Sequence, residues 1–479
     1  MPARNSRPKS LLESRQAVNK WCALIIPLVL IGIVGYATWV FIVQVCVNHF
    51  LTPSTADNVP PRPGAAIACI TIYLLLLLPM SVCYFRTVFL THLNPGYIPQ
   101  GTPNHTLRQT FVEEPRADIE WPCASTTTGA DDDAEKRATK KKDVPGWYIS
   151  TLDLEGIFRG DIAPPSGMEE FYKRDVFQCD PNGLPIWCGT CRNWKPDRVH
   201  HCSDVGRCVW KLDHFCPWVG GVVGETNFKF FVQFNGYAAL FTAYITVVMA
   251  VVIAEQARRG RGLERVTWVV LVALSGLFLM FTGGMVGKSL QDMLMGLTTV
   301  DAIDAAKRTV FLAVKLKGGQ RTPVPPVEGK RDLSIPWQGT IAYPFVAKGQ
   351  TLDRPRETFA ILCTPPGLNP WDQGNAANWR SVMGERWYDW LLPVKMSPCC
   401  DHSSLESMYP LGLRFGELLE DAGIETAAVD EDRRGRRRHK HSGRSEKHGH
   451  EHRHKHRRHH ELEHGTGKKH RGDTASSST

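Results

Sequence analysis

The chain contains four long stretches without a charged residue, and they constrain its fold more than any other feature. They cover 21–47, 64–85, 230–254 and 266–286. Each has about 20 residues or more, enough for a helix to cross a hydrocarbon core of about 30 Å. Helices are favoured because backbone groups in lipid must satisfy one another. Buried core helices of a soluble protein rarely stay uncharged for so long, and a signal peptide would be shorter and end in a small-residue cleavage site.

Positive charge near these stretches predicts their orientation. The N-terminal flank holds five basic residues, whereas the loop at 48–63 carries only Arg62. Because Lys and Arg collect on the cytoplasmic side, we expect a multi-pass membrane protein with both termini and the long middle segment cytoplasmic. The loop between the third and fourth stretches opposes this orientation with four arginines, Arg258, Arg259, Arg261 and Arg265.

The net charge of +9 comes from the C-terminal tail, because the tail carries +11 and the remainder of the chain −2. Between Arg433 and Arg471, 15 Lys or Arg stand against 4 Glu, and 11 of the 18 histidines are also there. Low hydrophobicity and high charge predict a disordered tail, as they do for 126–143. A solvated tail and contact with anionic lipid both remain open. We expect no nucleic-acid partner, because the tail has no aromatic platform and no folded module behind it.

Six of the 14 cysteines lie between Cys179 and Cys216. On a reducing cytoplasmic side, such a cluster favours metal binding or catalysis over disulfides. Cys188 and Cys191 form a C-x2-C knuckle, and His201 and Cys208 follow. Three cysteines and a histidine suit one tetrahedral structural zinc ion. The alternative is four unrelated residues in a loop.

Asp213, His214 and Cys216 bring a carboxylate, an imidazole and a thiol within four residues. An imidazole can take the proton of a thiol, and a carboxylate can orient the imidazole. The residues alone leave open that Cys216 is instead a zinc ligand.

The region 187–231 resembles the cysteine-rich domain of the DHHC family of protein S-acyltransferases, in a fungal-like variant whose signature reads Asp-His-Phe-Cys. Further resemblance lies in the "NPGYIP" segment from Asn94, the "TTVD" segment ending at Asp301, and the segment 369–384 with its key Asn378. The resemblance implies palmitoyl transfer from acyl-CoA through a Cys216 acyl-enzyme, with His214 as base and Asp213 as its orienting group. It also implies that Lys195, Arg198 and His200 contact the CoA phosphates, the alternative being a solvated basic face. We expect an apolar cavity among the helices to hold the acyl chain, with Trp218 and Phe231 either lining it or anchoring at the membrane interface.

The resemblance also sets the fold class and the partners that we expect. The fold is an all-α polytopic membrane protein, with a small zinc-bound cytoplasmic cysteine-rich domain between helices two and three. The partners are palmitoyl-CoA, the lipid bilayer, and membrane or peripheral proteins with cytoplasmic cysteines. The expected organisation is an N-terminal segment (1–20), helix one (21–47), helix two (64–85), a cytoplasmic loop with an insert (86–186), the catalytic domain (187–231), helix three (230–254), helix four (266–286), a cytoplasmic C-terminal region (287–425) and a disordered tail (426–479).

One departure from the family pattern concerns a second zinc site. Its four ligand positions match Cys202, Val205, Phe215 and Val222. Three of the four are apolar here, so we predict a packed hydrophobic cluster in place of an ion. The same departure supports an alternative function, a catalytically weak zinc-containing membrane scaffold that binds partner proteins.

Overall fold

The structure is a computed structural model, and it describes residues 9–53, 60–101, 156–157, 165–260, 265–303, 305–316, 337–345 and 356–424. Apart from Ile424, these residues belong to one compact unit, formed by Met1–Leu316 and Arg321–Gly423. The predicted disordered segments at 126–143 and 426–479 lie outside the described residues.

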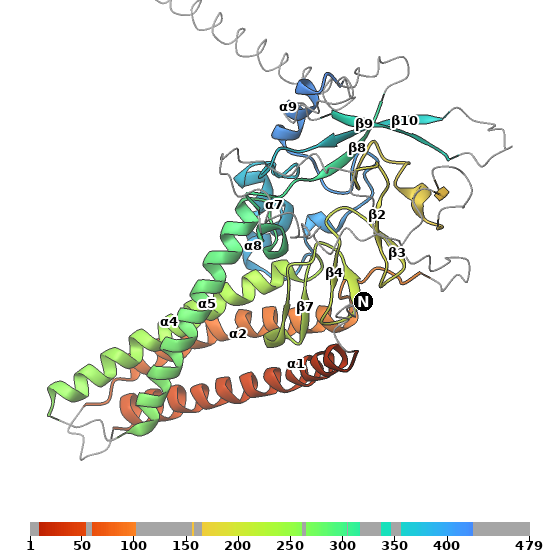
Figure 1. Cartoon of the computed structure of the whole chain (residues 1–479). Helices are drawn as coiled ribbons and strands as arrows, with labels where there is room; N and C mark the ends of the chain where they lie inside the picture. The colour runs from red at the N-terminus through yellow and green to blue at the C-terminus, as the bar shows by residue number, and fades with distance from the viewer. Residues whose placement is uncertain are drawn as a thin grey trace, which may run out of the picture. The chain divides into compact units, whose positions relative to one another are not determined.

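Four helices in the described part are long and apolar enough to cross a membrane, which agrees with the four candidate spanning helices predicted. The first begins as α1 (Lys9–Thr38) and continues as a π-helical stretch, η1 (Trp39–Leu51). The others are α2 (Pro63–Leu93), α4 (Phe228–Arg258) and α5 (Val266–Leu294) (Figure 1). α2 begins at a proline, which suits a first helical position because its missing N–H has no partner there anyway.

The membrane helices pack around a core of aromatic and aliphatic side chains. α4 contacts both α5 and α2, and η1 contacts α2. At the centre, the Phe41 and Tyr73 rings stack 4.8 Å apart, and the Tyr73 hydroxyl lies 2.8 Å from Thr38 Oγ1. Many other large apolar side chains on these helices are exposed, among them Leu75 and Leu78 of α2. Such a surface fits lipid rather than water.

The cysteine-rich region between α2 and α4 consists of three short antiparallel β-hairpins. They pair β2 with β3, β4 with β5, and β6 with β7. Their bounds are β2 (Ile186–Cys188), β3 (Asn193–Lys195), β4 (His200–Cys202), β5 (Arg207–Val209), β6 (His214–Cys216) and β7 (Gly221–Val223). A short 3₁₀ turn, η4 (Pro217–Val219), joins the last two strands. Strands this short bury little surface, so the hairpins need other support.

A four-stranded antiparallel sheet lies outside the membrane helices, and the sequence analysis did not predict it. Its order is β1–β8–β10–β9. The bounds are β1 (Val176–Cys179), β8 (Phe311–Lys315), β9 (Trp337–Tyr343) and β10 (Glu357–Cys363). Its buried face shares one hydrophobic cluster with Trp187 and Trp194 of the β2–β3 hairpin. The sheet therefore anchors the first hairpin.

Short helices after α5 complete the described chain. They are α6 (Thr299–Ala302), α7 (Asn375–Met383), α8 (Trp387–Leu391) and α9 (Leu413–Asp421), with the 3₁₀ turn η5 (Pro398–Cys400). Another 3₁₀ turn, η3 (Met168–Glu170), precedes β1. α7 packs against α5 and α4. Asn378 of α7 fixes this position, since its Nδ2 donates to the carbonyl of Leu294 at 2.8 Å.

Candidate active site

The third hairpin places His214 and Cys216 on one face of a strand. Residues i and i+2 of β6 point the same way, whereas Phe215 between them points to the other face. His214 and Cys216 both line a cavity among the membrane helices. Because side chains two residues apart lie on the same face of a strand, this spacing brings the imidazole and the thiol together.

Asp213 holds the imidazole of His214 from the other side. His214 Nδ1 lies 2.7 Å from Asp213 Oδ2, and the aspartate is buried. An Nδ1–H bonded to Asp213 leaves Nε2 free to accept a proton. Burial lowers the pKa of His214, but hydrogen bonds to Asp213 and Cys216 and their negative charges outweigh it and raise the pKa to about 9.

A residue from beyond the fourth membrane helix holds Asp213 in turn. The Thr299 amide donates to Asp213 Oδ1 at 2.9 Å, and the Thr299 hydroxyl donates to the Asp213 carbonyl. Both carboxylate oxygens are thus engaged, one by His214 and one by Thr299. α6 presents this amide in its first turn, where N–H groups lack partners within the helix.

The four predicted metal ligands converge. The ligand atoms of Cys188, Cys191, His201 and Cys208 all lie within 4.8 Å of one another. His201 Nδ1 is 3.6, 3.3 and 3.9 Å from the sulfurs of Cys188, Cys191 and Cys208. Zinc–sulfur and zinc–nitrogen bonds of about 2.3 and 2.0 Å in a tetrahedron separate such atoms by about 3.6 Å. The set can therefore hold a metal ion without rearrangement.

The hairpin registers explain how these ligands meet. His201 of β4 lies directly opposite Cys208 of β5. Cys188 ends β2, and the Cys191 amide donates to Cys188 Sγ at 3.4 Å in the turn that follows. Two ligands therefore come from a strand pair and two from a knuckle. No other group of this kind occurs among the described residues.

The positions of the second ligand set form the predicted hydrophobic cluster. Val222 and Cys202 are buried, and Phe215 and Val205 pack against them. Phe215 and Val222 lie directly opposite each other in the β6–β7 hairpin. Tyr97 after α2 and Val300 of α6 contact the same cluster. Apolar packing therefore links the β6–β7 hairpin to the segment after α2 and to α6.

A cavity of about 520 Å³ opens beside Cys216. Its walls come from all four membrane helices and are mainly apolar, and Trp218 and Phe231 line it as predicted. The volume is within the range of about 300–1,000 Å³ that ligand pockets occupy. The Phe231 ring also packs edge-on against His214 at 5.3 Å, so the cavity ends at the imidazole.

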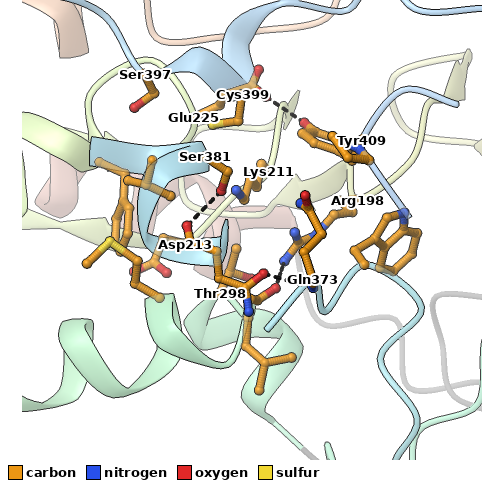
Figure 2. Close-up of a pocket in the computed structure, with 18 residues that line it drawn as sticks. Arg198, Lys211, Asp213, Glu225, Thr298, Gln373, Ser381, Ser397, Cys399 and Tyr409 are labelled. Atoms are coloured by element: carbon orange, nitrogen blue, oxygen red, sulfur yellow. Dashed lines mark hydrogen bonds between the residues drawn. The ribbon is translucent and has the colours of Figure 1, made fainter. Parts of the chain in front are cut away.

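A second, much smaller pocket lies beside Asp213 (Figure 2). Its volume is about 30 Å³, room for little more than a water molecule. Arg198, Lys211 and Glu225 line it together with Asp213 (Figure 2). It is too small for an acyl chain or a nucleotide, so the apolar cavity is the better candidate for a substrate.

The three residues predicted to contact CoA phosphates have different surroundings. Arg198 is buried, and its guanidinium bonds to Asp301 Oδ2 at 2.6 Å and to the Gly296 carbonyl at 2.8 Å. His200 is partly exposed, and its Nε2 lies 3.7 Å from Asp301 Oδ1. Lys195 ends β3 and is partly exposed. The burial of Arg198 leaves it no exposed edge for a phosphate.

Comparisons with known proteins agree with this geometry. The family model of the DHHC palmitoyltransferases matches residues 182–306. Palmitoyltransferase pfa5 of Aspergillus fumigatus is 36% identical over 86% of this chain and 93% of that protein. Its namesake in Emericella nidulans is 32% identical over 85% and 87%. The chain belongs to the DHHC palmitoyltransferase family.

The chain is therefore a protein S-palmitoyltransferase of a multi-pass membrane type. A more distant relative, palmitoyltransferase PFA5 of Saccharomyces cerevisiae, is 24% identical over 61% of this chain and 66% of its own length. The matched residues 182–306 span the three hairpins, α4, α5 and α6, which are the elements that build the site.

Sequence reasoning missed two contacts of this palmitoyltransferase site. One is the bond from Thr299 to Asp213, and the other is the buried ion pair of Arg198 and Asp301, which Arg308 joins at 2.5 Å from Asp301 Oδ1. The "TTVD" segment was recognised by resemblance, but its partners lie 86 and 103 residues away in the chain. In the sequence, the only sign of a buried partner for Arg198 was Asp301, an acidic residue close to the fourth span.

Proposed function

We propose that palmitoyl transfer proceeds through a thioester on Cys216, with His214 as the proton carrier and Asp213 as its orienting group. The observation that carries this proposal is the position of Cys216, beside an imidazole anchored by a buried carboxylate and at the mouth of an apolar cavity. A pKa of about 9 for His214 favours an imidazolium next to Cys216 at neutral pH. The thiolate is the nucleophilic form of cysteine.

The proposed reaction has two balanced halves. The Cys216 thiolate attacks the carbonyl carbon of acyl-CoA, the bond from that carbon to the CoA sulfur breaks, and the leaving sulfur takes the proton from His214. The substrate cysteine then gives its proton to His214 and attacks the Cys216 thioester, which releases the Cys216 thiolate. One thioester replaces another in each half, so no external energy source is needed.

We propose acyl-CoA as the donor, with its acyl chain in the 520 Å³ cavity. Lys195 and His200 remain the proposed contacts for the CoA phosphates, because both side chains are partly exposed, although the Nε2 of His200 is buried beside Asp301. For Arg198 we propose a different role. Its bonds to Asp301 and to the Gly296 carbonyl join the cysteine-rich domain to the chain after α5, so it helps to position α6 and Thr299.

We propose that Cys188, Cys191, His201 and Cys208 bind one zinc ion. The distances among their ligand atoms fit a tetrahedral ion, and soft sulfur ligands favour zinc over magnesium or calcium. Zinc would supply folding energy to hairpins too short to be stable alone. The catalytic residues lie in the next hairpin and take no ligand role.

For orientation we propose that both termini and the catalytic domain are cytoplasmic. Basic residues before the first span and the reducing conditions that free thiolates need support this side. Substrates would be membrane or peripheral proteins with cysteines close to the bilayer, because the thioester forms at the membrane end of the catalytic hairpin.

Labelling with a clickable palmitoyl-CoA tests the proposal. The purified protein should gain a label that hydroxylamine removes, Cys216→Ser should abolish it, and His214→Ala should slow it strongly. Cys22→Ser in α1 is a matched control and should label like the wild type. Undiminished, hydroxylamine-sensitive labelling of Cys216→Ser would refute the assignment, and an unlabelled wild type would favour the membrane scaffold.

A further inference from the structure

A buried lysine at the start of α4 has no role in the chemistry above. Lys229 is only 1% exposed, and among the described residues none accepts a hydrogen bond from its Nζ. A buried, unpaired ammonium is unfavourable, because its lost hydration is not replaced. The amine is therefore a candidate for a bound anion.

The charges around Lys229 are mostly positive. The charged groups that act on its amine are Asp389 of α8, Arg86 of α2 and Lys395 after α8. Asp389 is the only carboxylate among these groups, and it also pairs with Lys395, whose Nζ lies 3.5 Å from Asp389 Oδ1. The Arg86 guanidinium lies over the Phe230 ring at 4.4 Å and has no carboxylate partner among the described residues. Three cations against one carboxylate leave a net charge of two for an anion to neutralise.

Of these cations, Lys229 lies at the level of a membrane's headgroups, and Arg86 lies at the inner boundary of that layer. α4 has 31 residues and is about 46 Å long. The hydrocarbon core takes about 30 Å, so about 8 Å at each end reaches the polar layer. Lys229 is the second residue of α4, within that layer. Arg86 is seven residues before the end of α2, about 10 Å along the helix.

α8 brings apolar side chains to the same level. It packs against α4, since Gln233 Nε2 donates to the Trp390 carbonyl at 2.9 Å and the Tyr237 hydroxyl donates to the Leu391 carbonyl at 2.9 Å. Around these contacts, Trp387, Leu391 and Leu392 are more than half exposed. Exposed apolar side chains next to a cationic site are typical of a segment lying in the membrane interface.

The site is separate from the acyl cavity. Phe231 faces that cavity, whereas Lys229 is two residues earlier and thus about 200° around the helix. None of Lys229, Arg86 and Lys395 lines the cavity. A lipid phosphate therefore suits the position better than the phosphates of CoA.

We propose that Lys229, Arg86 and Lys395 bind the phosphate of an anionic phospholipid in the leaflet next to the catalytic domain, while the exposed face of α8 lies among its acyl chains. Phosphate oxygens would complete the hydrogen bonds of Lys229, as charge-assisted bonds do at other phosphate sites. The occupant is thus a lipid with a free negative charge, rather than a zwitterionic one.

The test measures lipid binding to the delipidated full-length protein by native mass spectrometry, with phosphatidylglycerol and phosphatidylcholine as probes. We expect phosphatidylglycerol to bind preferentially and Lys229→Met to weaken it by about tenfold, the loss of one charge-assisted contact. Lys288→Met is the matched control, a lysine near the end of α5 that already pairs with Asp292. Lys288→Met should leave phosphatidylglycerol binding unchanged. Lys229→Arg, which keeps the positive charge, should bind phosphatidylglycerol as the wild type does.

Three outcomes would overturn the proposal. The first is equal phosphatidylglycerol binding by the wild type and Lys229→Met. The second is displacement of the lipid by coenzyme A without an acyl chain, which would assign the site to the donor. The third is equal competition by inorganic phosphate, which would make it a general anion site. If Lys229→Met does not fold, the double variant Arg86→Gln with Lys395→Gln gives the same measurement.

Discussion

Replacement of Asp213 by asparagine tests the central electrostatic argument of the site. The pKa of His214 rises from its ordinary 6.5 to about 9, and its bond to Asp213 is the largest favourable contribution. A shift of that size corresponds to about 3 kcal/mol of net imidazolium stabilisation, to which Asp213 contributes most and Cys216 also contributes, against the cost of burial. Asparagine keeps the size of the side chain but loses its charge. Its amide can also donate to Nδ1, which would place the imidazole proton on Nε2.

We expect Asp213→Asn to slow formation of the Cys216 thioester by about a hundredfold or more, since about 3 kcal/mol in the barrier is about two orders of magnitude. Single-turnover labelling with palmitoyl-CoA measures this rate directly. Asp401→Asn, a carboxylate outside the site, is the matched control and should label at the normal rate. The direction of the pH dependence follows from the raised pKa of His214. The imidazolium of His214 exists below about pH 9 and is lost above it, so the variant's deficit should shrink as pH rises through 9.

A rate within threefold of the wild type at pH 7 would refute this reasoning. It would mean that Asp213 does not set the charge of His214. A large deficit that stays constant up to pH 10 would also count against it, because the charge on the imidazole would then be irrelevant. Intact binding of zinc by Asp213→Asn would show that the domain is still folded.

Two further predictions concern the support of the catalytic hairpin. Elemental analysis should find about one zinc per chain, and Cys191→Ser should lose both zinc and thioester formation; a stoichiometry near two would contradict the hydrophobic cluster. Phe215→Ala should lower the thermal unfolding temperature more than Phe215→Leu, because truncation of a buried Phe costs about 3–5 kcal/mol and this side chain is only partly buried, so we expect somewhat less. Equal effects of the two substitutions would show that packing of Phe215 is unimportant.

The membrane helices could be predicted from sequence because lipid imposes a simple rule on them. Twenty or so uncharged residues have few alternatives to a spanning helix. The metal set was predictable for a similar reason, since the C-x2-C knuckle is local and the other two ligands lie in one nearby hairpin. The cluster of Val205, Phe215 and Val222 was predicted from residue types, although only the register shows that Phe215 and Val222 face each other.

Other parts could not be predicted because their partners are far apart in the chain. Strand β1 near residue 176 pairs with β8 near residue 311, and no sequence period links them. The burial of Arg198 was hidden for the same reason, because Asp301 lies 103 residues away. From sequence alone, a basic residue near a ligand site predicts a contact with phosphate. The structure shows that Arg198 pairs with Asp301 instead.

The bond from Thr299 to Asp213 has a consequence for how the enzyme is made. Asp213, His214 and Cys216 are synthesised before the third and fourth membrane helices, whereas Thr299 follows both. A ribosome must therefore complete α4 and α5 before the residue that holds Asp213 exists. Until those helices have been made and packed, the nascent chain carries Cys216 and His214 without the bond from Thr299 that holds Asp213. The order of synthesis thus delays the bond from Thr299 to Asp213 until both helices have been made.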